Sequence, residues 1–280
     1  MPTTHSSIVF TFVAVLAVVV SPRFARGQTG ALDATTVSVE IVTRAAELAY
    51  TRDLARARAS NALDADRGQL ASLRRILQPL LVGAGTLRSE TKRWRWAISV
   101  ETRDEPVAYC LPGGKLLVST GLIDRPKLTP AEQGAVLAHA IAHALAAHDA
   151  DESLARLARE GDAGGADPNR AVAKLAEILA KLVGSEPHTI ADERAADTLG
   201  LELMARSGLD PRVSVDAWRK IARAGGATPP GFLALHPTSS ERFVEIEAQM
   251  PAMVTLYETT LRERPAATGV VLPPAMPARR

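Results

Sequence analysis

The sequence has little cysteine, since Cys110 is the only one in 280 residues. A single thiol excludes an internal disulfide and any zinc site built from several cysteines. We interpret Cys110 as a small buried core residue. The apolar run at Ile8–Val20 has only 13 residues, which is too short to cross a bilayer comfortably.

The chain also lacks an excess of charge of either sign. Its 33 Lys and Arg residues against 31 Asp and Glu give a formal net charge of +2. Residues 1–27 hold two arginines and no acidic residue, so removing them would bring the charge to 0. Because nucleic-acid binding requires a basic surface, nucleic acid is not an expected partner. An apolar content of 46% is enough for one sizeable core, so we expect one main domain.

The run Ile8–Val20 has the length of a signal-peptide core, and Ala25-Arg26-Gly27 offers a small–x–small cleavage site. We therefore expect residues 1–27 to be a signal peptide and the mature protein to be periplasmic or secreted. No Lys or Arg precedes the run, while two arginines follow it, which leaves an uncleaved membrane anchor as the alternative. Membrane association is expected only if the leader is retained.

The remainder divides into three parts by composition and pattern. Residues 28–64 are expected to form an N-terminal helical segment, 65–263 the main domain, and 264–280 a proline-rich, poorly ordered tail. A helical pattern covers Val37–Val82, and Gly83-Ala84-Gly85 is expected to end it. Its clearest part is an apolar stripe at three- and four-residue spacing, made by Leu70, Leu73, Leu77 and Leu80.

Three short strands are predicted next. Trp and aliphatic residues alternate with other types over Arg93–Glu101, which predicts a half-buried strand. Val107–Leu111 and Lys115–Thr120 are two further strand candidates, separated by Pro112-Gly113-Gly114. Proline followed by glycine suits a type II turn. The sequence therefore predicts a small antiparallel sheet.

An alanine-rich helix is predicted directly after these strands, over Thr129–His148, with Thr129 as its N-cap and Glu132 closing a capping box. His139 and His143 are four residues apart, so both imidazoles project from one face and can converge on a metal ion. On this pair alone, two polar residues on an amphipathic helix are an equally good interpretation.

The residue after the first histidine is Ala140. In the H-E-x-x-H pattern of zinc peptidases this position carries the glutamate that acts as general base. Glu132 does not replace it, because seven residues place it about 10 Å away along the helix axis. The sequence thus has the two histidines of a metal site, His139 and His143, but no glutamate beside them to accept a proton.

Two later segments carry further candidates. Thr189 is expected to cap a helix in which Glu193 and Asp197 lie four residues apart on one face. A carboxylate is a common third zinc ligand, and a second acid can orient a ligating imidazole, although such a pair is more often a solvated helix face. His236 precedes a proline, which places it at the end of a loop before a helix that starts near Ser239.

Taken together, these segments resemble the HtpX-like and BepA-like zinc metallopeptidases, metallopeptidase family forty-eight, which also includes integral-membrane prenyl-protein peptidases. The resemblance covers about Ala65–Ala248. The matching residues are Ala108-Tyr109-Cys110-Leu111-Pro112-Gly113-Gly114, Ser119-Thr120-Gly121-Leu122, Ala135-Val136-Leu137-Ala138-His139 with His143 and His148, Glu193 with Ala196, Asp197 and Gly200, and His236-Pro237 with Arg242.

The resemblance implies an α+β, mainly α, zincin-like fold with the small sheet beside the active-site helix. It also implies that His139, His143 and Glu193 bind Zn²⁺. Asp197 would be the acid that orients a ligand, and His236 the active-site histidine. The edge strand that binds the substrate would consist of Lys115, Leu116, Leu117 and Val118. The chain departs from the family pattern at Val107, where Asn is usual, and at Ala140, where the catalytic Glu is usual.

Two functions follow from the missing glutamate. The first is a pseudopeptidase of exported zinc-peptidase ancestry, which binds a polypeptide substrate or client protein and is catalytically impaired. The second is an active zinc-dependent endopeptidase of envelope protein quality control that uses another base. General-base help is worth roughly 10² to 10⁴ in rate, so we favour the pseudopeptidase.

Overall fold

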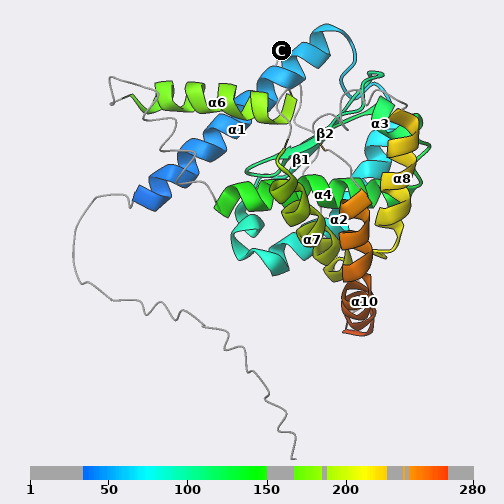
Figure 1. The fold of residues 1–280 in the computed structure, drawn as a ribbon. Coiled ribbons are helices and arrows are strands. Elements are labelled where there is room, and N and C mark those ends of the chain that lie inside the picture. Colours follow the sequence, from blue (N-terminus) through cyan, green and yellow to red (C-terminus); the bar gives the residue numbers. More distant parts are fainter. Residues whose placement is uncertain (1–33, 150–166, 185–187, 226–235, 237–239, 264–280) are drawn as a thin grey trace, which may run out of the picture. The chain divides into compact units, whose positions relative to one another are not determined.

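The computed structural model describes residues 34–149, 167–184, 188–225, 236 and 240–263. Its elements are mostly helices, with one small sheet (Figure 1), as the predicted α+β, mainly α class requires. In chain order they are α1 (Ala34–Ala59), α2 (Arg67–Leu87), the 3-10 helix η1 (Ser89–Arg93), β1 (Ala97–Glu101), β2 (Ala108–Leu111), β3 (Lys115–Ser119), α3 (Thr120–Asp124), α4 (Pro130–Asp149), α6 (Pro168–Gly184), α7 (Ile190–Arg206), α8 (Val213–Gly225) and α10 (Ser240–Glu263).

The sheet is mixed, so the prediction of an antiparallel sheet is wrong for one of its two pairings. Its strand order is β1-β3-β2, with β3 antiparallel to β2 and parallel to β1. The turn between β2 and β3 is the predicted type II turn, because Gly113 has a φ of 78° and Gly114 N donates to Leu111 O at 3.1 Å. The parallel pairing joins strands that are distant in the chain and leaves no mark in local periodicity.

The first strand is shorter than predicted. The 3-10 helix η1 takes up the chain as far as Arg93, and the regular strand begins only at Ala97. Trp96 is held in this entry segment, because its Nε1 donates to Thr91 O at 3.1 Å. The strand is also buried at four of its five residues instead of on one face. A loop covers its outer side, where Asp64 Oδ1 accepts a hydrogen bond from Val100 N at 2.7 Å.

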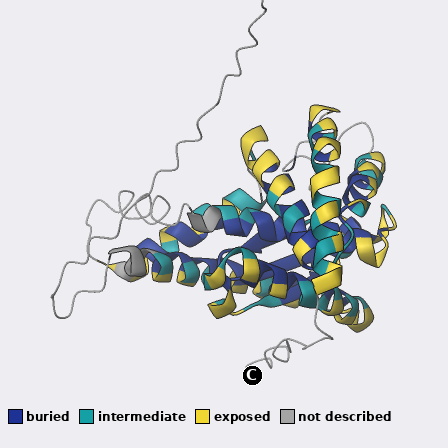
Figure 2. Cartoon of the chain, turned by 90° about the horizontal axis from the view of Figure 1, so that it is seen from below, coloured by how far each residue is buried: buried dark blue, intermediate teal, exposed yellow. Residues whose placement is uncertain are grey.

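Each face of the sheet packs against its own set of helices. Alternate strand residues, among them Ile98, Cys110 and Leu116, belong to one apolar core with α2, α4, α7 and α8. The intervening residues Tyr109 and Leu117 belong to a second core with α1 and α6. Figure 2 shows the strands and the inward helix faces as buried. Helix α1, which falls in the expected N-terminal segment 28–64, therefore belongs to the same compact unit as the other described elements.

Helix α2 continues past the glycines that were expected to end it. A Cβ at Gly83 would clash with Ser207 Oγ, so glycine is needed there for a close approach of α2 to the end of α7. The four leucines of the predicted stripe are buried, which confirms their role in the core. Cys110 is buried and unpaired, as predicted.

The two helices expected to carry metal ligands begin where the sequence predicts. Thr129 and Glu132 form the expected capping box, with Thr129 N donating to Glu132 Oε2 at 2.7 Å. Thr189 and Asp192 form another at the start of α7. The two helices pack directly on each other. A Cβ at Gly200 would lie 3.3 Å from the backbone of His139, so this glycine keeps α7 close to α4 at the first histidine.

No helix within the described ranges is long and apolar enough to cross a membrane. The expected signal peptide, residues 1–27, and the expected tail, residues 264–280, lie outside the described residues. So does the side chain of His148.

Candidate metal centre

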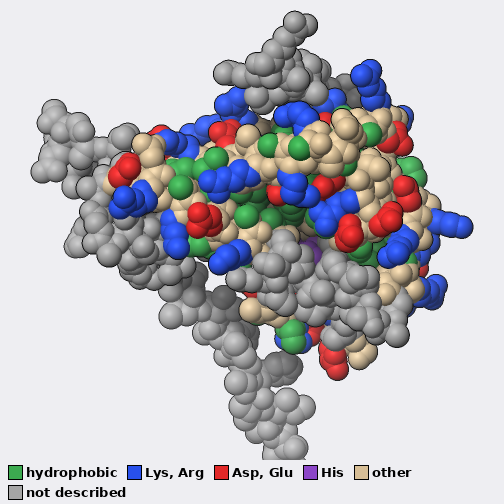
Figure 3. Space-filling view, turned by 90° about the horizontal axis from the view of Figure 1, so that it is seen from above, with side chains coloured by type: hydrophobic (Ala, Val, Ile, Leu, Met, Phe, Trp, Pro, Cys, Tyr) green, Lys and Arg blue, Asp and Glu red, His purple; other side chains and the backbone are tan. Residues whose placement is uncertain are grey.

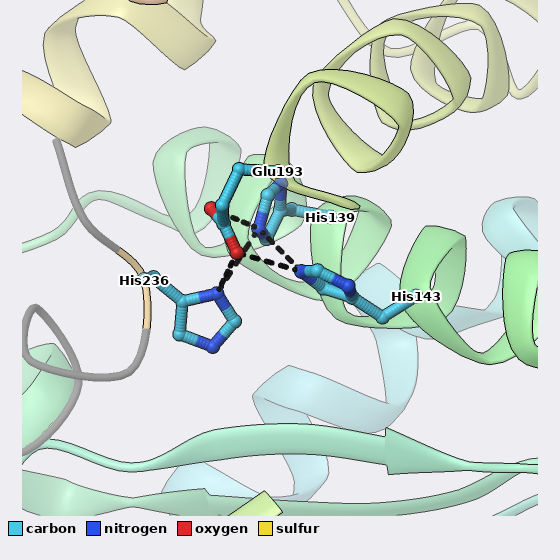
Figure 4. Close-up of side chains that lie close together, drawn as sticks. All are labelled: His139, His143, Glu193 and His236. Atoms are coloured by element: carbon cyan, nitrogen blue, oxygen red, sulfur yellow. Dashed lines mark hydrogen bonds and ion pairs between the residues drawn. The ribbon is translucent and has the colours of Figure 1, made fainter. Parts of the chain in front are cut away.

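Four side chains from three parts of the chain converge beneath the surface. His139 and His143 project from one face of α4, Glu193 comes from the first turn of α7, and His236 comes from the segment between α8 and α10 (Figure 4). One donor atom from each lies within 4.8 Å of the others. The sequence predicted each of these four residues at the site, and the fold brings them together.

The spacing of the donor atoms suits one small cation. His143 Nε2 lies 3.1 Å from both His139 Nε2 and Glu193 Oε1. His139 Nε2 lies 3.4 Å from Glu193 Oε2 and from His236 Nδ1. Zinc–nitrogen bonds of about 2.1 Å at tetrahedral angles would place donor atoms about 3.4 Å apart. The donors are therefore already about as far apart as ligands of one tetrahedral ion.

Behind the donors lies a buried layer of charged groups. Asp197 Oδ1 lies 3.2 Å from His139 Nδ1, the ring nitrogen that faces away from the other donors. Arg242 donates to Asp197 Oδ1 at 2.8 Å, and its Nη1 lies 2.7 Å from Glu193 Oε2. The guanidinium carbon lies 5.0 Å from the ring centre of Trp218, which also packs edge-on against His139. This layer orients two of the four donors.

Burial and these contacts set the charge state of the cluster. Burial lowers the pKa of His143 to about 4 and that of His236 to about 3, so both rings are neutral at pH 7. Burial alone would raise the pKa of Glu193, but hydrogen bonds with His139, His143 and His236 hold it well below its usual range. Burial alone would lower the pKa of His139, but hydrogen bonds with Asp197 and Glu193 raise it above its ordinary value. Zinc in proteins takes a carboxylate and neutral imidazoles, so the metal would compete with a proton at His139.

The face drawn in Figure 3 has no dominant charge. Figure 3 shows Lys and Arg mixed with Asp and Glu, and only a small area of histidine on the face drawn. His139, Glu193 and His236 are buried, and His143 is partly exposed. The donors are thus largely screened from solvent by the fold.

Ala140 is 3% exposed and packs within the apolar core on the site side of the sheet. Glu132 does not serve the site, because Lys220 Nζ lies 2.8 Å from its Oε1 and it also caps α4. The remaining nearby acids, Glu193 and Asp197, both contact imidazoles and Arg242. Among the described residues, therefore, each acid near the cluster is already paired.

The segment Lys115–Val118, expected to be a substrate-binding edge strand, is the middle of the sheet. Its backbone pairs with β1 on one side and with β2 on the other, so it is not available to a peptide. Leu116, Leu117 and Val118 are core residues, and Lys115 Nζ donates to the carbonyl of Arg95. The edge-strand prediction is wrong because the parallel pairing with β1 covers the second side of β3. The local sequence pattern does not show that pairing.

Two residues of the site were not assigned a place from the sequence. Arg242 was noted as a matching residue without a role, and His188 was not noted at all. His188 stacks on His143, with ring centres 4.1 Å apart and an interplanar angle of 19°. His188 directly precedes Thr189, the N-cap of α7, and Glu193 lies in the first turn of the same helix. This proximity in sequence is the signal that could have identified His188.

A model of peptidase family M48 matches residues 68–250, which span the sheet, both ligand-bearing helices and His236. The chain belongs to peptidase family M48. The M48 match starts after α1, so the second core of the sheet lies partly outside the matched region. The fold is accordingly the zincin-like α+β fold that the sequence predicted.

Curated relatives include two mitochondrial metalloendopeptidases OMA1. The one from Arabidopsis thaliana is 30% identical over 159 residues, which are 52% of this chain and 30% of the relative. The one from Schizosaccharomyces pombe is 29% identical over 181 residues, 59% of this chain and 50% of the relative. The beta-barrel assembly-enhancing protease of Yersinia pestis is 29% identical over 152 residues, 50% of this chain and 31% of the relative. The alignments thus span half or less of these relatives.

Proposed function

We propose that this M48 protein binds zinc through His139, His143 and Glu193, with His236 as a fourth donor, and engages polypeptide chains without cutting them efficiently. The observation that carries the proposal is the combination of four converging donors with a methyl group at position 140. Two or three imidazoles and a carboxylate favour Zn²⁺ over Mg²⁺ or Ca²⁺, which prefer oxygen ligands. When bound, zinc would polarise a substrate carbonyl and lower the pKa of a water molecule to about 7.

The proposal that cleavage is inefficient rests on what this chain's own residues can do with a proton. A general base contributes roughly 10² to 10⁴ in rate, and Ala140 has no group that can accept a proton. The acids near the cluster are held by other partners: Glu193 by imidazoles and Arg242, and Asp197 by Arg242 and His139. No described carboxylate is therefore placed to substitute.

His236 supports the same proposal. Its Nδ1 lies 2.8 Å from Glu193 Oε1 and 3.4 Å from His139 Nε2, which places it at the distance of a fourth donor. Structural zinc sites have four protein ligands, whereas catalytic sites keep one position open for water or substrate. A fourth protein donor at this place favours a closed site.

For the polypeptide we propose the outer edge of β2 as the binding strand, because β2 is a terminal strand in the order β1-β3-β2. Ser119 N donates to Val107 O, and Gly114 N donates to Leu111 O. The backbone oxygens of Val107 and Leu111 therefore point toward β3 and its turn. In an antiparallel pair the alternate residues point their backbone groups the other way. The outward groups are thus those of Ala108 and Cys110, on a strand that also packs against α4. An extended peptide could add there through main-chain hydrogen bonds.

The test restores the carboxylate. Ala140→Glu should raise the zinc-dependent cleavage of casein by roughly 10²-fold or more over the wild-type rate. Ala140→Gln is the matched control, because it adds nearly the same volume without a base and should gain nothing. Equal rates for Ala140→Glu and wild type would show that more than the base is missing.

The names of the relatives favour a second candidate, an active endopeptidase. This candidate predicts that the wild-type protein cleaves unfolded casein, that a chelator abolishes the cleavage, and that added zinc restores it. Wild-type cleavage as fast as that of Ala140→Glu would support it over our proposal.

We further propose export, from the predicted leader at residues 1–27. N-terminal sequencing of protein recovered from the periplasm of a bacterial host should find a chain that begins at residue 28. A protein that keeps its leader and sediments with membranes would favour the anchor instead.

A further inference from the structure

The four donors are not equally supported by their surroundings. The Nδ1 of His139 faces Asp197, and the outer oxygen of Glu193 lies against Arg242. His143 differs: its ion contact is made by Nε2, and among the described residues no charged group lies against its Nδ1. Its side chain is also the most exposed of the four, at 13% against 1% to 6%. Within the described part of the chain, polar contacts therefore hold this ring at its Nε2 alone, through Glu193 and His139, and leave its other side to packing.

The side chain that contacts the face of His143 is His188. The two rings are nearly parallel, at 19°, with their centres 4.1 Å apart. His188 also lies near His236, with ring centres 4.8 Å apart. His188 is not one of the four residues whose donor atoms converge. It therefore meets the cluster as a flat surface and not as another ligand.

Local sequence explains why His188 points at the cluster. Thr189 is the N-cap of α7, and its capping box with Asp192 fixes the direction in which the chain enters the helix. His188 is the residue before the cap, and Glu193 is the fourth residue of the helix. Side chains at these two positions commonly pack together. The start of α7 thus places Glu193 among the donors, and the residue before its cap, His188, stacks on the ring of His143.

We propose that His188 is a positioning residue that holds the His143 ring by stacking and covers its exposed side, so that bound zinc is released slowly. The inference rests on the proposed zinc site. Offset-stacked rings contribute about a 2- to 10-fold factor in an equilibrium constant beyond the area that they bury. A ligand ring with one fixed plane also loses less freedom when the metal binds.

The test measures zinc affinity and release in the full-length protein, by competition with a chromophoric chelator. His188→Ala should bind zinc about 2- to 10-fold more weakly and release it faster. His188→Phe keeps a flat ring without nitrogen and should stay within about twofold of wild type. Ile190→Ala, at the first residue of α7 and 61% exposed, is the matched control and should change nothing.

Cobalt provides a second readout. The visible spectrum of the Co²⁺-loaded protein should change in His188→Ala, because the His143 ring reorients, and it should be restored in His188→Phe. Zinc release from His188→Ala at the wild-type rate would overturn the proposal. A His188→Phe variant that binds zinc as weakly as His188→Ala would overturn it too, because the ring nitrogens and not the stacking would then be responsible. If wild type binds no zinc, the proposed function itself fails, and this inference fails with it.

Discussion

The two faces of the sheet are covered by helix pairs of opposite character. On one face, α1 and α6 meet through small and aliphatic side chains such as Ala45, Ala49 and Leu175. On the other face, α4 and α7 bury His139, Glu193 and Asp197 between them. The first contact stabilises the fold by removing apolar surface from water. The second contains buried charged groups, which cost free energy unless they are paired.

The difference indicates that the α4–α7 contact is built for a ligand. Glu193 and Asp197 bring two negative charges, and Arg242 offsets one of them. These three groups keep one net negative charge, which a divalent cation among the four donors would more than offset. The apolar pair needs no ligand, so it can hold the sheet while the polar pair keeps its groups in place for the metal.

Loss of a donor should have the largest effect. We expect His139→Ala to lose at least about 100-fold in zinc affinity, because the ring lies at the centre of the cluster, near all three other donors. Elemental analysis of purified protein should find about one zinc per wild-type chain and almost none in the variant. Zinc should also raise the melting temperature of wild type only, since a ligand stabilises the state that binds it. A variant with the zinc content of wild type would remove His139 from the ligand set.

A substitution that creates a cavity on the α1–α6 face of the sheet should lower the stability of the fold without changing zinc affinity. Leu175 is fully buried between α1, α6 and the sheet, so Leu175→Ala should destabilise the fold by about 2 to 5 kcal/mol. Urea denaturation of the zinc-free protein measures this effect. Zinc affinity at low temperature, where the variant stays folded, should match wild type. A large loss of zinc affinity would mean that the two faces are coupled.

The acid behind the first ligand should matter less than the ligand. Asp197→Asn keeps the volume of the side chain but removes the charge that faces His139 and Arg242. We expect about 10- to 100-fold weaker zinc binding, as for other groups that orient a ligating histidine. Glu202→Gln is the control on the same helix, because among the described residues the ion pair of Glu202 is with the partly exposed Arg206. Equal affinities for Asp197→Asn and the control would contradict the assignment.

The smallest effect is expected at Glu132, near the other end of α4. Burial alone would raise its pKa, but hydrogen bonds with Lys220 and Thr129 lower it below the ordinary value. The charged form therefore stabilises the fold above the ordinary pKa, and this contribution is lost as the pH falls through the lowered folded pKa. Glu132→Gln should lower the free energy of unfolding by about 1 kcal/mol at pH 7. The difference in stability between wild type and variant should disappear below about pH 4.

Thermal unfolding at a series of pH values measures the Glu132 effect. Zinc affinity should not change, because Glu132 is about 10 Å along the helix from His139. A variant that also loses zinc would place Glu132 in the site after all.

The sequence predicted what depends on local chemistry. The caps at Thr129 and Thr189 were found because a capping box needs only residues within four positions of each other. His139 and His143 were found as a metal half-site because their spacing puts both rings on one helix face, whereas Glu193 and His236 were assigned through the family resemblance. Each of these features can be read within one short stretch of chain or from the resemblance.

Non-local packing accounts for the errors. Gly83 was expected to end a helix, but it makes room for Ser207 from a segment more than a hundred residues later. Lys115–Val118 was expected at a sheet edge, but β1 pairs with its other side. His188 was not noted because its neighbours His143 and His236 are remote in the chain. None of these contacts has a local periodicity that could show it.

The central claim is that three imidazoles and one carboxylate surround a single zinc ion beside a position without a base. X-ray absorption at the zinc edge of the loaded wild-type protein tests it most directly. The zinc should have about four nitrogen or oxygen neighbours at about 2.0 to 2.1 Å, with the outer-shell signal of three imidazoles, and one imidazole fewer in His236→Ala. A wild-type protein that holds no zinc, or a spectrum of six oxygen neighbours without imidazole signal, would contradict it.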